Sequence, residues 1–90
     1  MPREPGRDQS RHPADPADMI DHQGGKLIWM QVADLLRDQL ASMPAGQMLP
    51  SVRTLMQTYG VSDGTVKRAL AQLREENLII TYQGRGSFKA

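Results

Sequence analysis

The 90-residue sequence contains no cysteine, and this absence excludes a disulfide framework and thiolate ligands for a metal. Its two histidines, His12 and His22, lie in the polar N-terminal third. An apolar run long enough to span a bilayer, about 18 residues, is also missing, as is the apolar core of a signal peptide. We therefore expect a cytoplasmic protein without a membrane segment.

The side chains of an enzyme active site are equally scarce in the part of the sequence that is rich in apolar residues. It has no Ser-His-acid set, no pair of carboxylates in an apolar surrounding and no histidine-glutamate spacing typical of metal ligands. We therefore expect no enzymatic activity, no metal and no other cofactor.

Acidic and basic residues are unevenly distributed, although the formal net charge is only +1. Residues 1–24 hold three basic and five acidic side chains, four of the six prolines and few large apolar residues. Such a composition cannot offset the entropy cost of folding. We predict a disordered leader at 1–24 and one folded domain at 25–90. The basic excess lies at 50–90, where it favours an anionic partner.

Apolar residues that recur every three or four positions predict three helices. The first covers about 27–42 and is followed by Pro44 and Gly46, which end it. The second begins at about 52, and the third covers 63–76, so that the two form a tight corner. Three residues set these later boundaries: Ser51 and Ser62 as N-caps, and Gly60 as the left-handed residue that ends the second helix.

A β-hairpin is predicted after the third helix. The β-branched and aromatic run at 78–82 favours a strand, 83–86 a turn, and 87–89 a returning strand. The predicted fold class is therefore mainly α with a small β-hairpin. Three helices followed by a two-stranded wing are the order of a winged helix-turn-helix.

The corner between the second and third helices is an arrangement that lets the later helix enter the major groove of DNA. One face of the helix at 63–76 is apolar, while Gly64, Lys67 and Arg68 project from the other. We predict that the two cations bind the phosphate backbone. Further predicted contacts are the Thr65 hydroxyl and, at the start of the preceding helix, Ser51 and Arg53.

The turn of the hairpin is a second candidate contact with DNA. Gly84 and Gly86 flank Arg85 and leave a thin turn with one guanidinium at its tip. An exposed arginine of this kind suits a narrow minor groove, where the negative potential is strong. Trp29 is expected to pack at the core or its rim, and Tyr82 to cover the core, so neither is assigned a binding role.

Four motifs in the sequence follow one another with almost no gaps. They are Trp29-x-Gln31-Val32-Ala33-x-x-Leu36-Arg37, Gly46-x-x-Leu49-Pro50-Ser51-x-Arg53-x-Leu55, Val61-Ser62-x-x-Thr65-Val66-x-x-Ala69-Leu70-x-x-Leu73 and, after Leu78-Ile79, Gly84-x-Gly86-x-Phe88. Through them, segment 26–90 resembles the N-terminal winged-helix domain of the GntR family of bacterial transcription regulators.

The resemblance implies a protein that binds palindromic operators as a dimer. The helix at 63–76 would enter the major groove and the wing tip the minor groove. DNA contacts are implied for Arg53, Ser62, Asp63, Gly64, Thr65, Lys67, Gln83, Gly84 and Arg85.

Two departures from the family pattern concern the start of helices. Asp63 and Gly64 stand where the family usually has arginine followed by a residue with a side chain, and Thr54 stands where glutamate commonly completes a helix cap. Aspartate can accept a hydrogen bond from the N4 amino group of cytosine, so Asp63 is a candidate for base reading, with Gly64 allowing close approach. The alternative is that Asp63 only caps its helix and Gly64 has no role.

A third departure is that the family's C-terminal domain, which senses a small molecule and holds the dimer, is not among the 90 residues. The sequence is expected to be either a DNA-binding domain cut from a larger protein or a naturally short regulator. Since it contains no long apolar seam, we expect a monomer that pairs on a palindromic site.

The leading prediction is a sequence-specific regulator of transcription that binds double-stranded DNA, most simply a repressor, because a bound domain blocks polymerase. One alternative is a winged helix that binds proteins instead of DNA, favoured by Asp63 and by the low net charge. The other is the N-terminal fragment of a larger regulator with an effector domain or an aminotransferase-like domain.

Overall fold

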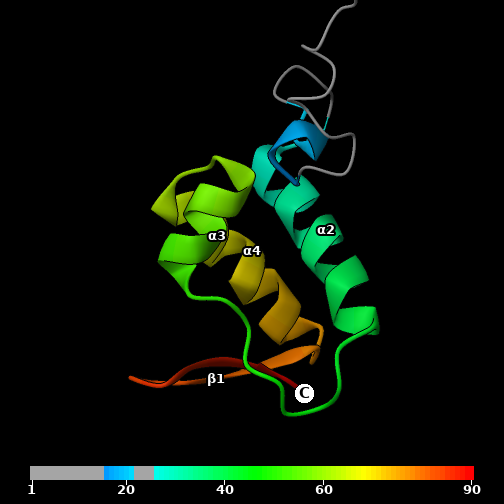
Figure 1. The fold of residues 1–90 in the computed structure, drawn as a ribbon, viewed down its shortest axis with the longest axis vertical. Coiled ribbons are helices and arrows are strands. Elements are labelled where there is room, and N and C mark those ends of the chain that lie inside the picture. The colour runs from blue at the N-terminus through cyan, green and yellow to red at the C-terminus, as the bar shows by residue number, and fades with distance from the viewer. Residues whose placement is uncertain (1–15, 22–25) are drawn as a thin grey trace, which may run out of the picture.

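Three α-helices and a β-hairpin make up the computed structural model, which describes residues 16–21 and 26–90 (Figure 1). The elements are η1 (Pro16–Met19, a turn of 3₁₀ helix), α2 (Ile28–Ala41), α3 (Val52–Tyr59), α4 (Asp63–Glu75), β1 (Ile79–Tyr82) and β2 (Gly86–Lys89). This order confirms the predicted winged helix-turn-helix. None of the helices in the two described ranges is both long and apolar enough to cross a bilayer.

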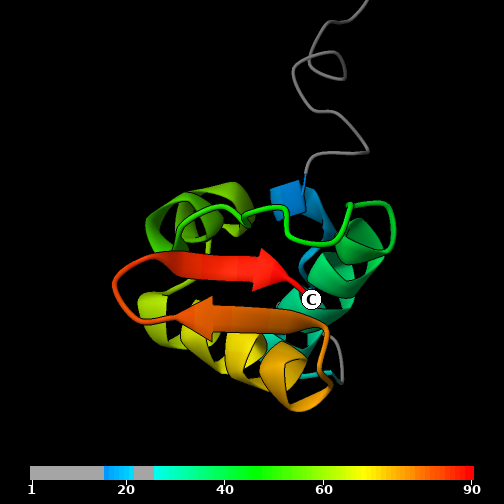
Figure 2. The ribbon, with the colours of Figure 1, turned by 90° about the horizontal axis from the view of Figure 1, so that it is seen from below.

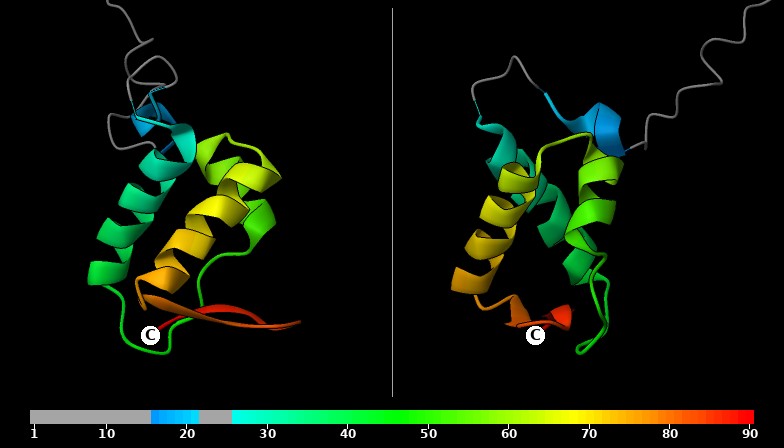
Figure 3. Two further views of the ribbon diagram at one scale, coloured as in Figure 1. Left: turned by 180° about the vertical axis from the view of Figure 1, so that it is seen from behind. Right: turned by 90° about the vertical axis from the view of Figure 1, so that its left-hand side faces the viewer.

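One hydrophobic core lies between the helices, where α4 packs against both α2 and α3 (Figure 3). Val32 and Leu36 from α2, Leu55 from α3, and Val66 and Leu73 from α4 are each no more than 1% exposed. The apolar face predicted for α4 is confirmed, since its buried residues are Val66, Ala69, Leu70 and Leu73. Burial of this face leaves the opposite side of α4 to solvent.

The corner between α3 and α4 is built from two helix caps of the same kind. The hydroxyl of Ser51 accepts a hydrogen bond from the amide of Thr54 at 3.1 Å, and that of Ser62 accepts one from the amide of Thr65 at 3.2 Å. Each serine also donates to the hydroxyl of its threonine at 3.0 Å. Gly60, at φ 66°, ends α3 in the left-handed region, as predicted.

The hairpin lies across one end of the helices (Figure 2). Its antiparallel register pairs Ile79 with Lys89 and Tyr82 with Gly86. The segment before α3 also joins it, because the amide of Leu49 donates to the carbonyl of Ser87 at 2.8 Å and that of Lys89 to the carbonyl of Gln47 at 2.8 Å. The sequence did not predict this pairing, which ties the wing to the connection between α2 and α3.

Residues 16–21 pack against the domain, which corrects the predicted leader at 1–24. Ile20 is only 6% exposed and belongs to the core, and η1 packs on α3. Gln31 of α2 accepts a hydrogen bond from the amide of Asp21 at 2.6 Å and donates to its carbonyl at 2.7 Å. An apolar side chain and a paired backbone therefore hold this short segment. Residues 1–15 and 22–25 of the predicted leader and domain start lie outside the described residues.

Candidate nucleic-acid interface

The first two turns of α4 present a thin polar surface. Asp63, Gly64 and Lys67 are exposed, and an added Cβ at Gly64 would meet no atom within 4 Å. The Nζ of Lys67 lies 3.1 Å from Oδ2 of Asp63, one turn before it. Free amides and the helix dipole make this end of a helix favourable for a phosphate, and the lysine offsets the charge of the aspartate. The backbone here is open to close approach by a partner.

A hollow of about 470 Å³ separates α4 from the hairpin turn. Lys67 and Arg74 line it from α4, and Arg85 lines it from the turn. The turn projects toward the side on which α4 begins (Figure 3). The hairpin turn is closed by a hydrogen bond of 2.9 Å from the amide of Arg85 to the carbonyl of Tyr82. Within it, Gly84 adopts the left-handed conformation at φ 79°. Three cations from two elements therefore surround one opening.

Arg74 was not among the residues predicted for the site. Its Nη1 donates to the hydroxyl of Thr81 on β1 at 3.4 Å, so the guanidinium lies between α4 and the wing. Arg74 follows Lys67 by seven positions, which is two helical turns along the same stripe. That spacing is the signal in the sequence that could have identified it.

Arg68 lies apart from this hollow. Its Cζ stands 4.6 Å from the ring centroid of Trp29 at the start of α2, within the range of a cation–π contact. The structure thus places Lys67 and Arg68, predicted together at the groove, toward different neighbours: the wing and α2. Trp29 is half-buried, in agreement with the predicted rim packing.

The predicted contact residues fall into three groups in the fold. Ser51 and Arg53 lie at the start of α3, where the Ser51 hydroxyl is engaged in its cap. The second group lies at the start of α4 and consists of Ser62, Asp63, Gly64, Thr65, Lys67 and Arg68. The third group forms the hairpin turn and consists of Gln83, Gly84 and Arg85. All are exposed except Thr65, which is half-buried. Whether each contacts DNA stays a prediction.

Tyr82 does not cover the core, contrary to expectation. Its side chain is 49% exposed and meets Phe88 edge-on, with ring centroids 5.7 Å apart. Alternation along a strand turns Tyr82 and Ile80 to the same side, and Phe88 faces Ile80 in the register. The hairpin therefore carries an apolar outer face that points away from the helices.

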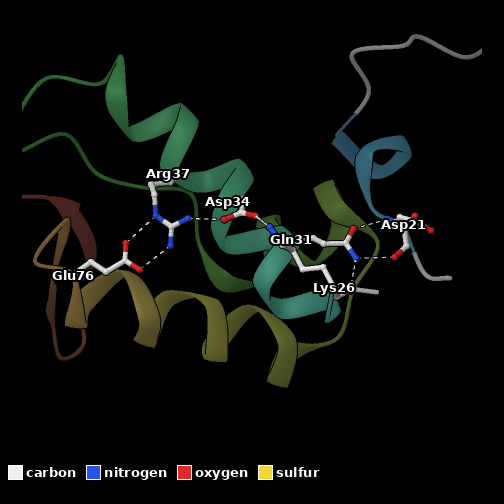
Figure 4. A network of polar contacts seen from close by, with 6 residues as sticks. All are labelled: Asp21, Lys26, Gln31, Asp34, Arg37 and Glu76. Atoms are coloured by element: carbon white, nitrogen blue, oxygen red, sulfur yellow. Dashed lines mark hydrogen bonds and ion pairs between the residues drawn. The ribbon is translucent and has the colours of Figure 1, made fainter. Parts of the chain in front are cut away.

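A network of charged groups fixes α4 against α2 (Figure 4). Arg37 of α2 donates from Nε and Nη2 to the carboxylate of Glu76 at 2.8 and 2.7 Å, and from Nη1 to Asp34 at 2.6 Å. Hydrogen bonds from Arg37 and Gln72 lower the pKa of Glu76, while those from Lys26 and then Arg37 lower the pKa of Asp34. The C-terminal end of α4 is thereby anchored to α2, while most of the candidate contacts lie at its other end.

A family model, curated relatives and solved structures all point to one family. The family model described as bacterial regulatory proteins of the gntR family matches residues 30–88. The mannosyl-D-glycerate transport/metabolism system repressor MngR of Escherichia coli K12 is 37% identical over 67 residues, which cover 72% of this chain and 28% of that repressor. The chain spans 28% to 31% of the length of the first curated relatives that it matches.

Solved structures share both the fold and part of the sequence. A GntR family transcriptional regulator from Listeria monocytogenes aligns with a TM-score of 0.70 and 30% identity, over 76% of this chain and 61% of that one. The DNA-binding domain of AraR, in a crystal structure with operator ORE1, aligns with a TM-score of 0.67 and 30% identity, over 69% of this chain and 78% of that one.

Proposed function

Because this chain belongs to the GntR family of bacterial regulatory proteins, we propose that it binds double-stranded DNA in the cytoplasm and regulates transcription, most simply as a repressor. The helix α4 enters the major groove, and the hairpin turn reaches the adjacent minor groove. The unit that does this is the domain predicted at 25–90, extended by the packed residues 16–21.

The observation that carries this proposal is the hollow between α4 and the wing. Lys67, Arg74 and Arg85 converge on it from two elements, and Gly64 leaves the neighbouring backbone bare. A strand of DNA that borders the groove would bring phosphates to these cations while α4 faces the bases. AraR supports this reading, because its similar DNA-binding domain was crystallised with an operator.

The proposed contacts divide by chemistry. Four cations bind phosphates: Arg53, Lys67, Arg68 and Arg74. The hydroxyl of Thr65 and the helix starts at Ser51 and Ser62 are neutral partners. Asp63 accepts a hydrogen bond from cytosine N4, and Gly64 lets the backbone approach. In the turn, Arg85 enters the minor groove beside Gln83 and Gly84.

A salt titration of DNA binding tests the proposal. Phosphate neutralisation makes log affinity fall linearly with log salt by about 0.9 per contact. With Arg53, Lys67, Arg68, Arg74 and Arg85 as contacts, the slope is expected to be about −4.5 per chain. The probe is a duplex selected by the chain itself from a random pool. Failure to bind any duplex at low salt would overturn the proposal.

The alternative of a protein-binding winged helix is favoured by one observation. Met48, Ile80 and Tyr82 are 55%, 45% and 49% exposed and gather on the outer face of the hairpin. A chain that binds no duplex at low salt would support this role.

A further proposal concerns the whole protein. Its relatives are about three times longer than this chain. We propose that this domain is part of a larger regulator with an effector domain, which binds a palindromic operator as a dimer.

A further inference from the structure

Arg68 is held in place by an aromatic ring and keeps its hydrogen-bonding edge free. Its Cζ lies over the ring of Trp29, 4.6 Å from the ring centroid. Unlike Arg37, which is bonded to Asp34 and Glu76, it makes no hydrogen bond or ion pair with the residues that the structure describes. A cation–π contact uses none of the N–H groups as hydrogen-bond donors to the ring, so these donors remain available for a phosphate.

Lys67 and Arg68 lie on opposite flanks of the surface that α4 offers to DNA. Successive residues of a helix are about 100° apart. Lys67 turns to the hollow beside the wing, and Arg68 to Trp29 on α2. Gly64 precedes them by three and four positions, so it lies one turn earlier between the two flanks. The bare backbone thus has a cation on either side.

The width of the major groove decides which DNA strand each flank of α4 faces. The groove is about 12 Å wide, and a helix with its side chains is about 10–12 Å across. A helix lying in the groove therefore faces one phosphate backbone on each side. Cations on opposite flanks cannot serve the same strand.

We propose that Arg68 binds a phosphate of one DNA strand while Lys67 and Arg74 bind phosphates of the other strand. Trp29 is the positioning residue of this second phosphate contact. By stacking on Arg68 it fixes the guanidinium before DNA arrives, which removes part of the entropy cost of ordering a long side chain on binding. This inference rests on the proposed function and adds to it a two-strand division of the phosphate contacts.

The test is a map of sensitive phosphates on a duplex that the full chain selects from a random pool. Each phosphate is replaced in turn by a neutral methylphosphonate, and affinity is measured for the wild type, Arg68→Ala and Lys67→Ala. Arg68→Ala is expected to bind about tenfold more weakly, with a salt slope smaller by about 1. Arg68→Ala should lose its sensitivity to methylphosphonate substitution on one strand only, and Lys67→Ala should lose it on the other strand only.

Trp29 is tested through its coupling to Arg68. Trp29→Leu should weaken DNA binding about threefold by removing the ring under the guanidinium, while Trp29→Phe should retain most of the affinity. In the Arg68→Ala background, Trp29→Leu should cost nothing further. Met30→Leu, on the same helix and 38% exposed in the wild type, is the control and should change nothing. A thermal melt of each variant shows that it is folded before its DNA binding is compared.

The outcomes separate this inference from the proposed function. A wild type that binds no duplex overturns both. A wild type that binds, with Arg68→Ala leaving the salt slope and the sensitive phosphates unchanged, overturns only the role of Arg68. Additive losses for Trp29→Leu and Arg68→Ala overturn only the positioning role of Trp29.

Discussion

Asp63 opens α4 and forms an ion pair with Lys67 at 3.1 Å. At this position an acid has two opposing effects, because it complements the helix dipole but repels phosphate. The pair with Lys67 reduces the repulsion and orients the carboxylate. Gly64, the next residue, adds no side chain to the surface. In the proposed complex, base choice would depend on Asp63 and on the bare backbone of Gly64 beside it.

Asp63→Ala is expected to relax the base preference. The variant loses an acceptor for cytosine N4, worth about 1 kcal/mol of discrimination, and gains affinity for all duplexes because one negative charge is gone. Selection from a random pool, followed by competition between matched and mismatched duplexes, measures both effects. Glu75→Ala, an exposed acid at the other end of α4, is the control for charge alone. Tighter binding with an unchanged preference would contradict the base-reading role.

Gly64→Ala is expected to move stability and DNA binding in opposite directions. Alanine favours the helix by about 0.5 kcal/mol, and its methyl group meets no atom within 4 Å in the free protein. On DNA the same methyl group would stand between the backbone and the groove and lower affinity about tenfold. Denaturant midpoints and fluorescence anisotropy measure the two quantities. A variant that is more stable and binds equally well would show that nothing approaches Gly64.

At the scale of elements, α4 is positioned by partners at both ends. Its start is fixed by the Ser62 cap and the tight corner after α3, and its far end by Arg37 of α2. The hairpin is held in turn by the segment before α3, through the bond between Leu49 and Ser87. The distance between α4 and the wing thus depends on contacts that each makes with other elements of the fold.

The charged network between α2 and α4 predicts a loss of stability in acid. Folding lowers the pKa of Asp34 and Glu76, so both stabilise the folded state above their unfolded values, roughly 4, and lose this contribution as the pH falls through the folded values. Urea midpoints measured from pH 7 to 3 should fall, and less steeply for Asp34→Asn and Glu76→Gln. Asp38→Asn, an exposed acid on α2, is the control. Identical pH profiles for all variants would argue against the network.

The segment at 16–21 is expected to contribute to stability through one side chain. Ile20 is 6% exposed in the core, so Ile20→Ala should cost about 2 kcal/mol, at the low end of such truncations because a short segment can adjust. Met19, its neighbour, is 47% exposed, and Met19→Ala should change stability by less than about 0.5 kcal/mol. Thermal and urea unfolding give both values. Equal effects of the two changes would mean that the segment does not pack in solution.

At the scale of the whole molecule, we expect a monomer in solution and two chains on one palindromic duplex. The apolar outer face of the hairpin is formed by Met48, Ile80, Tyr82 and Phe88. Four side chains are far fewer than the roughly 20 residues that each partner gives to a stable interface. Helix-turn-helix proteins pair on half-sites about one helical turn apart. Sedimentation velocity with and without DNA measures the stoichiometry. A dimer at micromolar concentration without DNA would contradict the expectation.

The sequence by itself determined the parts of this protein that depend on local chemistry. The caps at Ser51 and Ser62, the left-handed turn at Gly60 and the apolar stripe of α4 act within a few residues, so spacing predicted the helices and the corner. The β-branched run and the glycine turn predicted the hairpin. The exposed residues at the start of α4 followed from the same stripe.

Only the tertiary structure decided which distant residues meet. It buried Ile20, paired Leu49 with Ser87, brought Arg74 to the hollow and stacked Arg68 on Trp29. Each of these contacts joins segments separated in the chain by tens of residues or by a turn between elements. Such contacts form because the shared core brings elements together, and no local propensity encodes which side chains then become neighbours.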